Sequence, residues 1–185
     1  MRIIAGTCRS LPLKTPKGMN TRPTTDRIKE TLFNIIHSDL YDCRFLDLFA
    51  GSGAIGLEAL SRGAREAVFI ENNKEAIKCI EENIQFTKMA ERSKLIKADV
   101  IQGIHSLSSG ESFDIIFMDP PYGKEYEKEV LKMLSNSNLA DQNTLIVVEA
   151  DLETDFSYLG DLGFEMKRYK KYKTNAHAFI TRMGE

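Results

Sequence analysis

Residues 45–56 read Phe45-Leu-Asp-Leu-Phe-Ala-Gly-Ser-Gly-Ala-Ile-Gly56. The apolar start of this stretch predicts a buried strand, and Gly51, Gly53 and Gly56 then open a helix. Glycines at this G-x-G-x-x-G spacing allow a tight turn and let the backbone approach a ligand closely. The stretch therefore predicts the strand, loop and helix with which an α/β domain holds a cofactor.

Strand-like and helix-like segments alternate after this stretch. The further strand candidates are 67–70, 95–98, 113–118 and 144–149, and the helix candidates are 54–61, 73–87 and 125–134. Such alternation implies a Rossmann-like α/β fold with a mostly parallel sheet covered by helices. Two final strand candidates, 164–172 and 176–182, predict a C-terminal antiparallel hairpin and bring the expected sheet to seven strands.

Residues 1–42 differ in character from the alternating part. Their start reads as two short strands, and Thr24 or Thr25 caps a predicted helix with one apolar face. We therefore expect two parts, a small β-hairpin and helix over 1–42 and the main domain over 43–185.

Acidic residues follow the predicted strands and indicate which cofactor is bound. Glu71 lies 20 residues after Gly51 and suits a ribose, and up to this point a nicotinamide cofactor fits as well. Asp47 favours a different cofactor, because a carboxylate repels an anionic pyrophosphate and attracts the ammonium and sulfonium groups of S-adenosylmethionine. Asp99 ends a third strand, where it can accept from an adenine amino group. The sequence thus favours S-adenosylmethionine, although each acid taken alone also fits a helix cap or a solvated turn.

A fourth acid opens the tetrapeptide Asp119-Pro120-Pro121-Tyr122, directly after an apolar strand. The prolines fix φ and make the segment extended and stiff. Asp119 and the Pro120 carbonyl can accept the two N–H groups of a planar exocyclic amine, while Tyr122 stacks on the base. An ordinary proline turn is the alternative for this segment. Four acids at successive strand ends favour a ligand site, because open α/β sheets bind ligands at that edge.

The composition excludes several classes of protein. With 42% apolar and 28% charged residues, the 185-residue chain fits a globular domain. The apolar runs are too short for a membrane span and no signal peptide is apparent, so the cytoplasm is the expected location. The three cysteines and three histidines show no ligand spacing, and we expect no metal site.

Charge is distributed unevenly along the chain. Residues 1–44 carry a net charge of +4, residues 165–185 also carry +4, and the part between them is acidic. Basic ends of this kind attract a phosphate backbone, although a solvated rim explains each patch equally well.

The N-terminal residues add a specific resemblance. Met1-Arg-Ile-Ile-Ala-Gly6 with Arg9, Thr21-Arg-Pro-Thr-Thr-Asp-Arg27 and Lys29-Glu30, together with the glycine loop and Asp119-Pro-Pro-Tyr122, resemble the bacterial RsmD-type methyltransferases. The resemblance implies transfer of a methyl group from S-adenosylmethionine to the N2 amine of a guanine in 16S rRNA, within an assembled or partly assembled 30S subunit. It also implies an N-terminal appendage that docks RNA, and we expect a monomer.

The predicted site combines these residues. Asp47, Gly51, Gly53, Glu71, Asp99 and Asp119 are expected to bind the cofactor. Asp119, Pro120, Pro121 and Tyr122 are expected to act on the amine, and Arg9, Arg22, Arg27 and Lys29 are expected to hold phosphates. The alternatives are an adenine-N6 DNA methyltransferase, a glutamine methyltransferase, a nicotinamide oxidoreductase and an RNA-binding protein without activity.

Overall fold

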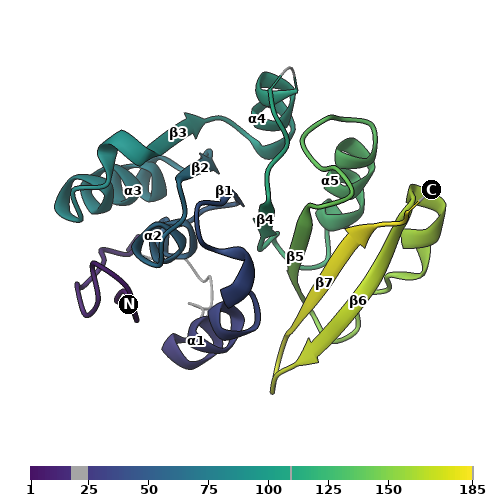
Figure 1. Ribbon diagram of the computed structural model, residues 1–185, viewed down its shortest axis with the longest axis horizontal. Coiled ribbons are helices and arrows are strands. Elements are labelled where there is room, and N and C mark those ends of the chain that lie inside the picture. The colour runs from purple at the N-terminus through teal and green to yellow at the C-terminus, as the bar shows by residue number, and fades with distance from the viewer. Residues whose placement is uncertain (18–24, 109, 185) are drawn as a thin grey trace.

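The computed structural model describes residues 1–17, 25–108 and 110–184, which form one sheet with helices on both faces (Figure 1). Among these residues the strands are β1 (Arg44–Leu48), β2 (Glu66–Glu71), β3 (Ser93–Lys97), β4 (Ile115–Met118), β5 (Leu145–Ala150), β6 (Phe164–Lys171) and β7 (Ala176–Arg182). Their order is β3-β2-β1-β4-β5-β7-β6. Strands β1 to β5 run parallel, and β7 is antiparallel to both β5 and β6. The predicted α/β fold with a mostly parallel sheet and a C-terminal hairpin is confirmed.

Successive residues of the strands face opposite sides of the sheet, as strand geometry requires. Phe45 and Phe69 belong to one apolar cluster, and their neighbours Leu46 and Val68 belong to the other. The first cluster is covered by α1 (Asp26–Ile35), α2 (Ala54–Ser61) and α3 (Lys74–Phe86). The second is covered by α4 (Val100–Leu107), α5 (Tyr126–Ser135) and the 3-10 helix η3 (Ser157–Leu162). Two further 3-10 turns, η1 (His37–Asp39) and η2 (Ala90–Arg92), join elements.

Polar side chains cap three of the helices. Thr25 Oγ1, Asn73 Oδ1 and Asp99 Oδ1 accept the backbone N–H groups at the starts of α1, α3 and α4. These bonds satisfy donors that a helix start otherwise leaves unpaired. The sequence analysis did not predict α4, a helix of 8 residues that contains Gly103. A Cβ at Gly103 would lie 2.7 Å from Ile70, so close packing against β2 explains a glycine that weakens the local helix signal.

The N-terminal segment packs on α2 instead of forming a full hairpin. Its two arms share one bridge, Arg2 to Pro12, flanked by the bonds from the Ile3 N–H to the Leu11 carbonyl (3.0 Å) and from the Leu13 N–H to the Met1 carbonyl (2.9 Å). The next N–H groups, those of Ile4 and Ala5, donate to the Glu58 carboxylate at 2.8 and 3.1 Å. Because these donors go to a side chain, the pairing of the two arms does not extend to Ile4 and Ala5.

Glu58 also explains why one predicted RNA contact is wrong. The Lys29 side chain is 0% exposed, lies 3.3 Å from Glu58 Oε2 and donates to the Arg2 carbonyl. Arg62 contacts the other Glu58 oxygen at 2.7 Å. The expectation that Lys29 holds a phosphate is therefore not retained, because its charge is paired inside the protein.

The N-terminal segment and the sheet share one apolar cluster. Ile3, Leu13 and Phe33 pack in the same cluster as Phe45 and Leu57. The division into residues 1–42 and 43–185 with separate roles stays a prediction. None of the helices within the described ranges is long and apolar enough to cross a membrane.

Candidate active site

The carboxyl ends of β2, β1 and β4 bring the predicted acids to one edge of the sheet. Leu48 of β1 lies opposite both Ile70 of β2 and Met118 of β4, so Glu71 and Asp119 are the next residues on either side of β1. The chain order reverses between β1 and β4, which is where open α/β sheets bind their ligands. The structure thus places Glu71 and Asp119 at a common edge.

The three glycines after β1 are required for two structural reasons. Gly51 has φ +58° with open space around it, and Gly53 has φ +76° at the start of α2. Both conformations favour glycine, which has no Cβ. A Cβ at Gly56 would lie 2.3 Å from the Phe69 ring, so here glycine permits α2 to pack closely on β2. The loop is therefore built for a turn beside the sheet edge, as its spacing predicted.

Glu71 fixes this loop to the end of β2. Its Oε2 accepts the Gly51 N–H at 2.8 Å, and its Oε1 accepts the N–H groups of Asn72 and Asn73, each at 2.9 Å. Hydrogen bonds to three backbone donors hold the carboxylate in place. The arrangement presents an oriented carboxylate at the position expected for a ribose contact.

Asp47, which was expected to bind the cofactor, is buried beneath the glycine loop. The residue is 1% exposed, and its Oδ2 accepts the Gly56 N–H at 2.9 Å. Burial raises its pKa well above the ordinary aspartate value, the bond from Gly56 opposes that shift, and nearby Glu71 adds to it. Asp47 thus holds the start of α2 from beneath the glycine loop.

Asp99 combines a structural role with a suitable position. Its Oδ1 caps α4 by accepting the Gln102 N–H at 3.0 Å, and the residue is half-buried. The preceding Ala98 N–H donates to the Glu71 carbonyl at 3.1 Å, which keeps the end of β3 beside that of β2. The carboxylate of Asp99 therefore lies next to the Glu71 segment.

The tetrapeptide after β4 joins a half-buried acid to an exposed ring. Asp119 is half-buried, and its pKa is raised well above the ordinary value by burial first and then by the charges of Glu149 and Asp47. Pro120 is buried and Pro121 is exposed. Tyr122 is 49% exposed, which leaves ring surface on which a base can stack. The segment thus combines an acid that can accept an amine N–H with an exposed ring on which a base can stack.

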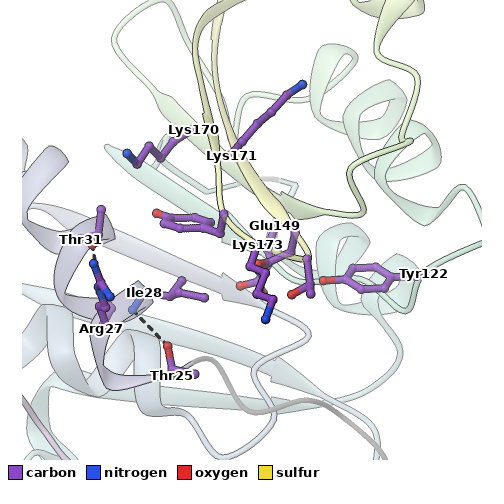
Figure 2. Close-up of a pocket in the computed structure, with 12 residues that line it drawn as sticks. Thr25, Arg27, Ile28, Thr31, Tyr122, Glu149, Lys170, Lys171 and Lys173 are labelled. Atoms are coloured by element: carbon purple, nitrogen blue, oxygen red, sulfur yellow. Dashed lines mark hydrogen bonds between the residues drawn. The ribbon is translucent and has the colours of Figure 1, made fainter.

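A cavity of about 510 Å³ lies beside this tetrapeptide (Figure 2). Its walls come from the start of α1, from Tyr122, from the end of β5, and from the end of β6 with the turn that follows it. In the view of Figure 2, Arg27 and Thr31 lie on one side and Tyr122 on the other, with Glu149 between them. The lining residues are Thr25, Arg27, Ile28, Thr31, Tyr122, Glu149, Lys170, Lys171, Tyr172, Lys173, Thr174 and Asn175.

A buried polar network in the wall of this cavity was not predicted. Glu149 Oε1 accepts from Asn175 Nδ2 at 2.6 Å, and Glu149 Oε2 lies 3.2 Å from His177 Nε2. The other ring nitrogen of His177 lies 3.2 Å from the Tyr172 hydroxyl. Glu149 follows an apolar run at the end of a parallel strand, so the signal that identified the other four acids could have identified this one. His177 has the buried, hydrogen-bonded environment of a structural histidine.

The predicted phosphate contacts divide into three groups. Arg27 lines the cavity and Arg9 is exposed on the N-terminal segment. Arg22 lies outside the described residues, and Lys29 is buried as described above. The cavity rim also carries Lys170, Lys171 and Lys173 from the C-terminal hairpin. Within the described ranges, three or more His, Cys, Asp or Glu side chains nowhere gather closely enough to hold a metal ion.

Comparison with known proteins places this chain among methyltransferases. The chain is 34% identical to YlbH of Bacillus subtilis (strain 168), whose name describes an rRNA methyltransferase. The alignment spans 186 residues and covers 100% of both chains. Ribosomal RNA small subunit methyltransferase D of Escherichia coli (strain K12) is 35% identical over 153 residues, which are 83% of this chain and 76% of the relative.

Solved structures agree with this placement. The structure of yhhF from Escherichia coli superposes with a TM-score of 0.85 at 31% identity and covers 100% of this chain and 99% of that chain. An RNA methyltransferase from Salinibacter ruber in complex with S-adenosyl-L-homocysteine shares the fold at a TM-score of 0.69 and 14% identity, over 89% of this chain and 95% of that chain. A family profile described as Conserved hypothetical protein 95 matches residues 1–181, and the chain therefore belongs to this family, the RsmD-type methyltransferases that its N-terminal motifs resemble.

Proposed function

We propose that this protein transfers a methyl group from S-adenosylmethionine to the exocyclic N2 amine of a guanine in 16S rRNA. The observation that carries the proposal is the position of Asp119-Pro-Pro-Tyr122, between the carboxylate edge of the sheet and a cavity with a basic rim. The substrate is an assembled or partly assembled small subunit in the cytoplasm, and the enzyme acts as a monomer. The names of the relatives support rRNA of the small subunit as the substrate class.

The residues at the edge fit S-adenosylmethionine. The cofactor, when bound, supplies an electrophilic methyl group on a cationic sulfur. Glu71 offers an oriented carboxylate for the ribose hydroxyls, and Asp99 offers one for the adenine amino group. The carboxylates of Glu71 and Asp99 at this edge favour a ligand that carries positive charge over an anionic pyrophosphate. These hydrogen-bond acceptors match S-adenosylmethionine better than they match a dinucleotide.

The residues of the tetrapeptide orient and polarise the amine. The lone pair of an exocyclic amine is delocalised into the purine ring, which makes the nitrogen a poor nucleophile. Acceptance of its two N–H groups by Asp119 and the Pro120 carbonyl draws the nitrogen toward a tetrahedral geometry. Stacking on Tyr122 holds the ring in place, and the rate gain then comes from orientation.

The basic rim of the cavity supports RNA as the substrate. Arg27 comes from α1, whereas Lys170, Lys171 and Lys173 come from the C-terminal hairpin. Cations on two sides of one cavity suit a backbone that passes across it. The guanine then enters the cavity from a loop or from a helix by base flipping.

Methyl transfer from labelled S-adenosylmethionine tests the proposal. The acceptors are 30S subunits, free 16S rRNA, and DNA, and mass spectrometry locates the modified base. We expect N2-methylguanine in the small-subunit rRNA. Transfer to adenine in DNA, or no transfer to any nucleic acid, would overturn the proposal. Calorimetry with S-adenosylmethionine and with NAD tests the cofactor separately.

A further inference from the structure

Glu149 of β5 lies directly beside the tetrapeptide that is proposed to hold the amine. Met118 of β4 is opposite Val148 of β5, so Asp119 and Glu149 are the next residues on two adjacent parallel strands. Neighbouring strands are about 4.8 Å apart. Glu149 contributes to the raised pKa of Asp119, which agrees with two carboxyl groups at close range. Glu149 also lines the cavity into which the base is proposed to enter.

The carboxylate of Glu149 is held in a defined orientation. Glu149 and His177 are opposite each other in the β5–β7 pair, and both are buried. His177 and Asn175 contact one oxygen each, at 3.2 and 2.6 Å, and Tyr172 supports the far side of the imidazole. Three residues of the C-terminal hairpin thus position one carboxylate at the end of β5. A carboxylate held in this way is suited to selecting a ligand by its hydrogen-bond pattern.

The hydrogen-bond pattern that fits two adjacent carboxyl groups is that of guanine. The Watson–Crick edge of guanine presents the N1–H beside one hydrogen of the N2 amine, and the second amine hydrogen points toward the sugar edge. Adenine presents a lone pair at N1, which a carboxylate would repel. With Asp119 and the Pro120 carbonyl on the amine, a carboxylate on the adjacent strand is placed to accept the N1–H.

We infer that Glu149 is a specificity-determining residue that accepts the N1–H of the target guanine and so selects guanine over purines with a lone pair at N1. Asn175 and His177 are the positioning residues of this contact. The inference rests on the proposed function and extends it, because it assigns base selection to the strand end next to the tetrapeptide.

The experiment compares guanine with 2-aminopurine at the modified nucleotide of a synthetic rRNA substrate. The 2-aminopurine base keeps the amine at position 2 but has a lone pair at N1. Wild-type enzyme is expected to favour guanine by a ratio of about 10- to 100-fold in kcat/KM, the range of one well-formed base contact. In Glu149→Gln the side-chain amide can donate to N1, so the ratio is expected to fall to within a few fold of one, chiefly through loss of the guanine reaction.

The matched control is Glu165→Gln on β6, which changes an acid of the same sheet outside the cavity. This variant is expected to keep the wild-type ratio. If Glu149→Gln lowers the rates on both bases equally, or if wild-type enzyme does not distinguish them, the inference is overturned. Absence of transfer to any guanine by wild-type enzyme would instead overturn the proposed function, so the two failures are distinguishable.

Discussion

At the scale of single residues, the surroundings of Asp119 favour its neutral form, whereas its proposed role needs the ionised form. Burial beside Glu149 and Asp47 favours the neutral acid and raises its pKa well above the ordinary value. Acceptance of an amine N–H is best performed by the ionised carboxylate. Groups whose ionisation is disfavoured in this way are concentrated at functional sites.

Removal of the Asp119 side chain tests its role in the reaction. Asp119→Ala is expected to lower kcat by about 10²- to 10³-fold, the usual effect of removing one oriented polar group from a transition state. Cofactor affinity is expected to change by only a few fold, because the glycine loop and Glu71 remain. Single-turnover methyl transfer and calorimetry with S-adenosylmethionine measure the two effects. Turnover near the wild-type level would remove Asp119 from the mechanism.

The raised pKa of Asp119 also predicts the pH dependence of methyl transfer. The accepting carboxylate is present above the raised pKa and is protonated as the pH falls through it. The acid limb of the kcat profile is therefore expected at a higher pH than an ordinary aspartate gives. Asp119→Asn keeps an oxygen acceptor that does not titrate, so its profile should lack this limb. An identical limb in both proteins would assign the titration to another group.

At the scale of elements, α2 connects the glycine loop at its start with the N-terminal segment along its side. Glu58 of α2 accepts the Ile4 and Ala5 N–H groups and pairs with Lys29 and Arg62. Burial lowers the pKa of Lys29, and the charge of Glu58 opposes that shift. A buried ion pair of this type is costly to break, since one partner is left unpaired in the interior.

Replacement of Glu58 is expected to loosen the N-terminal segment. Glu58→Ala should lower the free energy of unfolding by about 3–5 kcal/mol, because it leaves the buried charge of Lys29 without its opposite charge and two backbone N–H groups without their acceptor. The control is Glu82→Gln, which affects the solvent-exposed pair between Lys14 of the same segment and Glu82 of α3 and should leave the thermal midpoint close to that of wild type. Equal midpoints for the two variants would show that the buried pair does not anchor the segment.

Gly56 tests the packing of α2 on β2. Gly56→Ala places a methyl group against the Phe69 ring and is expected to cost about 1–3 kcal/mol of stability, as overpacked cores do. It should also weaken binding of S-adenosylmethionine, because α2 and its loop must shift. Gly160→Ala, with open space around its Cβ, is the matched control. Thermal unfolding and calorimetry measure both effects, and a stable Gly56→Ala protein with unchanged affinity would contradict the close packing.

At the scale of the whole molecule, the fold brings the two basic ends of the chain to one cavity. Arg27 of α1 and the lysines of the C-terminal hairpin belong to opposite ends of the sequence, yet they line the same space (Figure 2). The carboxylate edge lies at the carboxyl ends of the parallel strands. Positive and negative regions are thus adjacent, as a cationic cofactor and an anionic substrate require.

Charge reversal on the cavity rim tests the RNA interaction. Lys171→Glu with Lys173→Glu is expected to weaken RNA binding and to reduce the slope of log K against log salt by about 0.7–0.9 for each phosphate that no longer pairs with a cation. Arg65→Glu changes an exposed cation just before β2, at the opposite edge of the sheet, and should leave the slope unchanged. Equal slopes for all proteins would show that this rim does not meet the phosphate backbone.

The amino-acid sequence alone predicts the sheet and most of the edge that is proposed to bind the cofactor. A run of consecutive apolar residues predicts a strand that is buried on both faces of a sheet. The glycine spacing predicts a turn, because the φ angles that a residue can adopt depend on its own side chain. The carboxyl ends of parallel strands meet at one edge, so the acids that follow such runs could be placed together before any contact was known. Glu149 obeys the same rule and was predictable by it.

Which charged side chains can reach a ligand depends on how the elements pack in three dimensions. Lys29 reads as an exposed cation, and its burial depends on Glu58, a residue of another helix. Likewise, His177 and Asn175 meet Glu149 through an antiparallel pairing of strands, across 26 to 28 residues of sequence. A side chain's burial and partners are set by the packing of elements distant in sequence, and neither composition nor spacing encodes that packing locally.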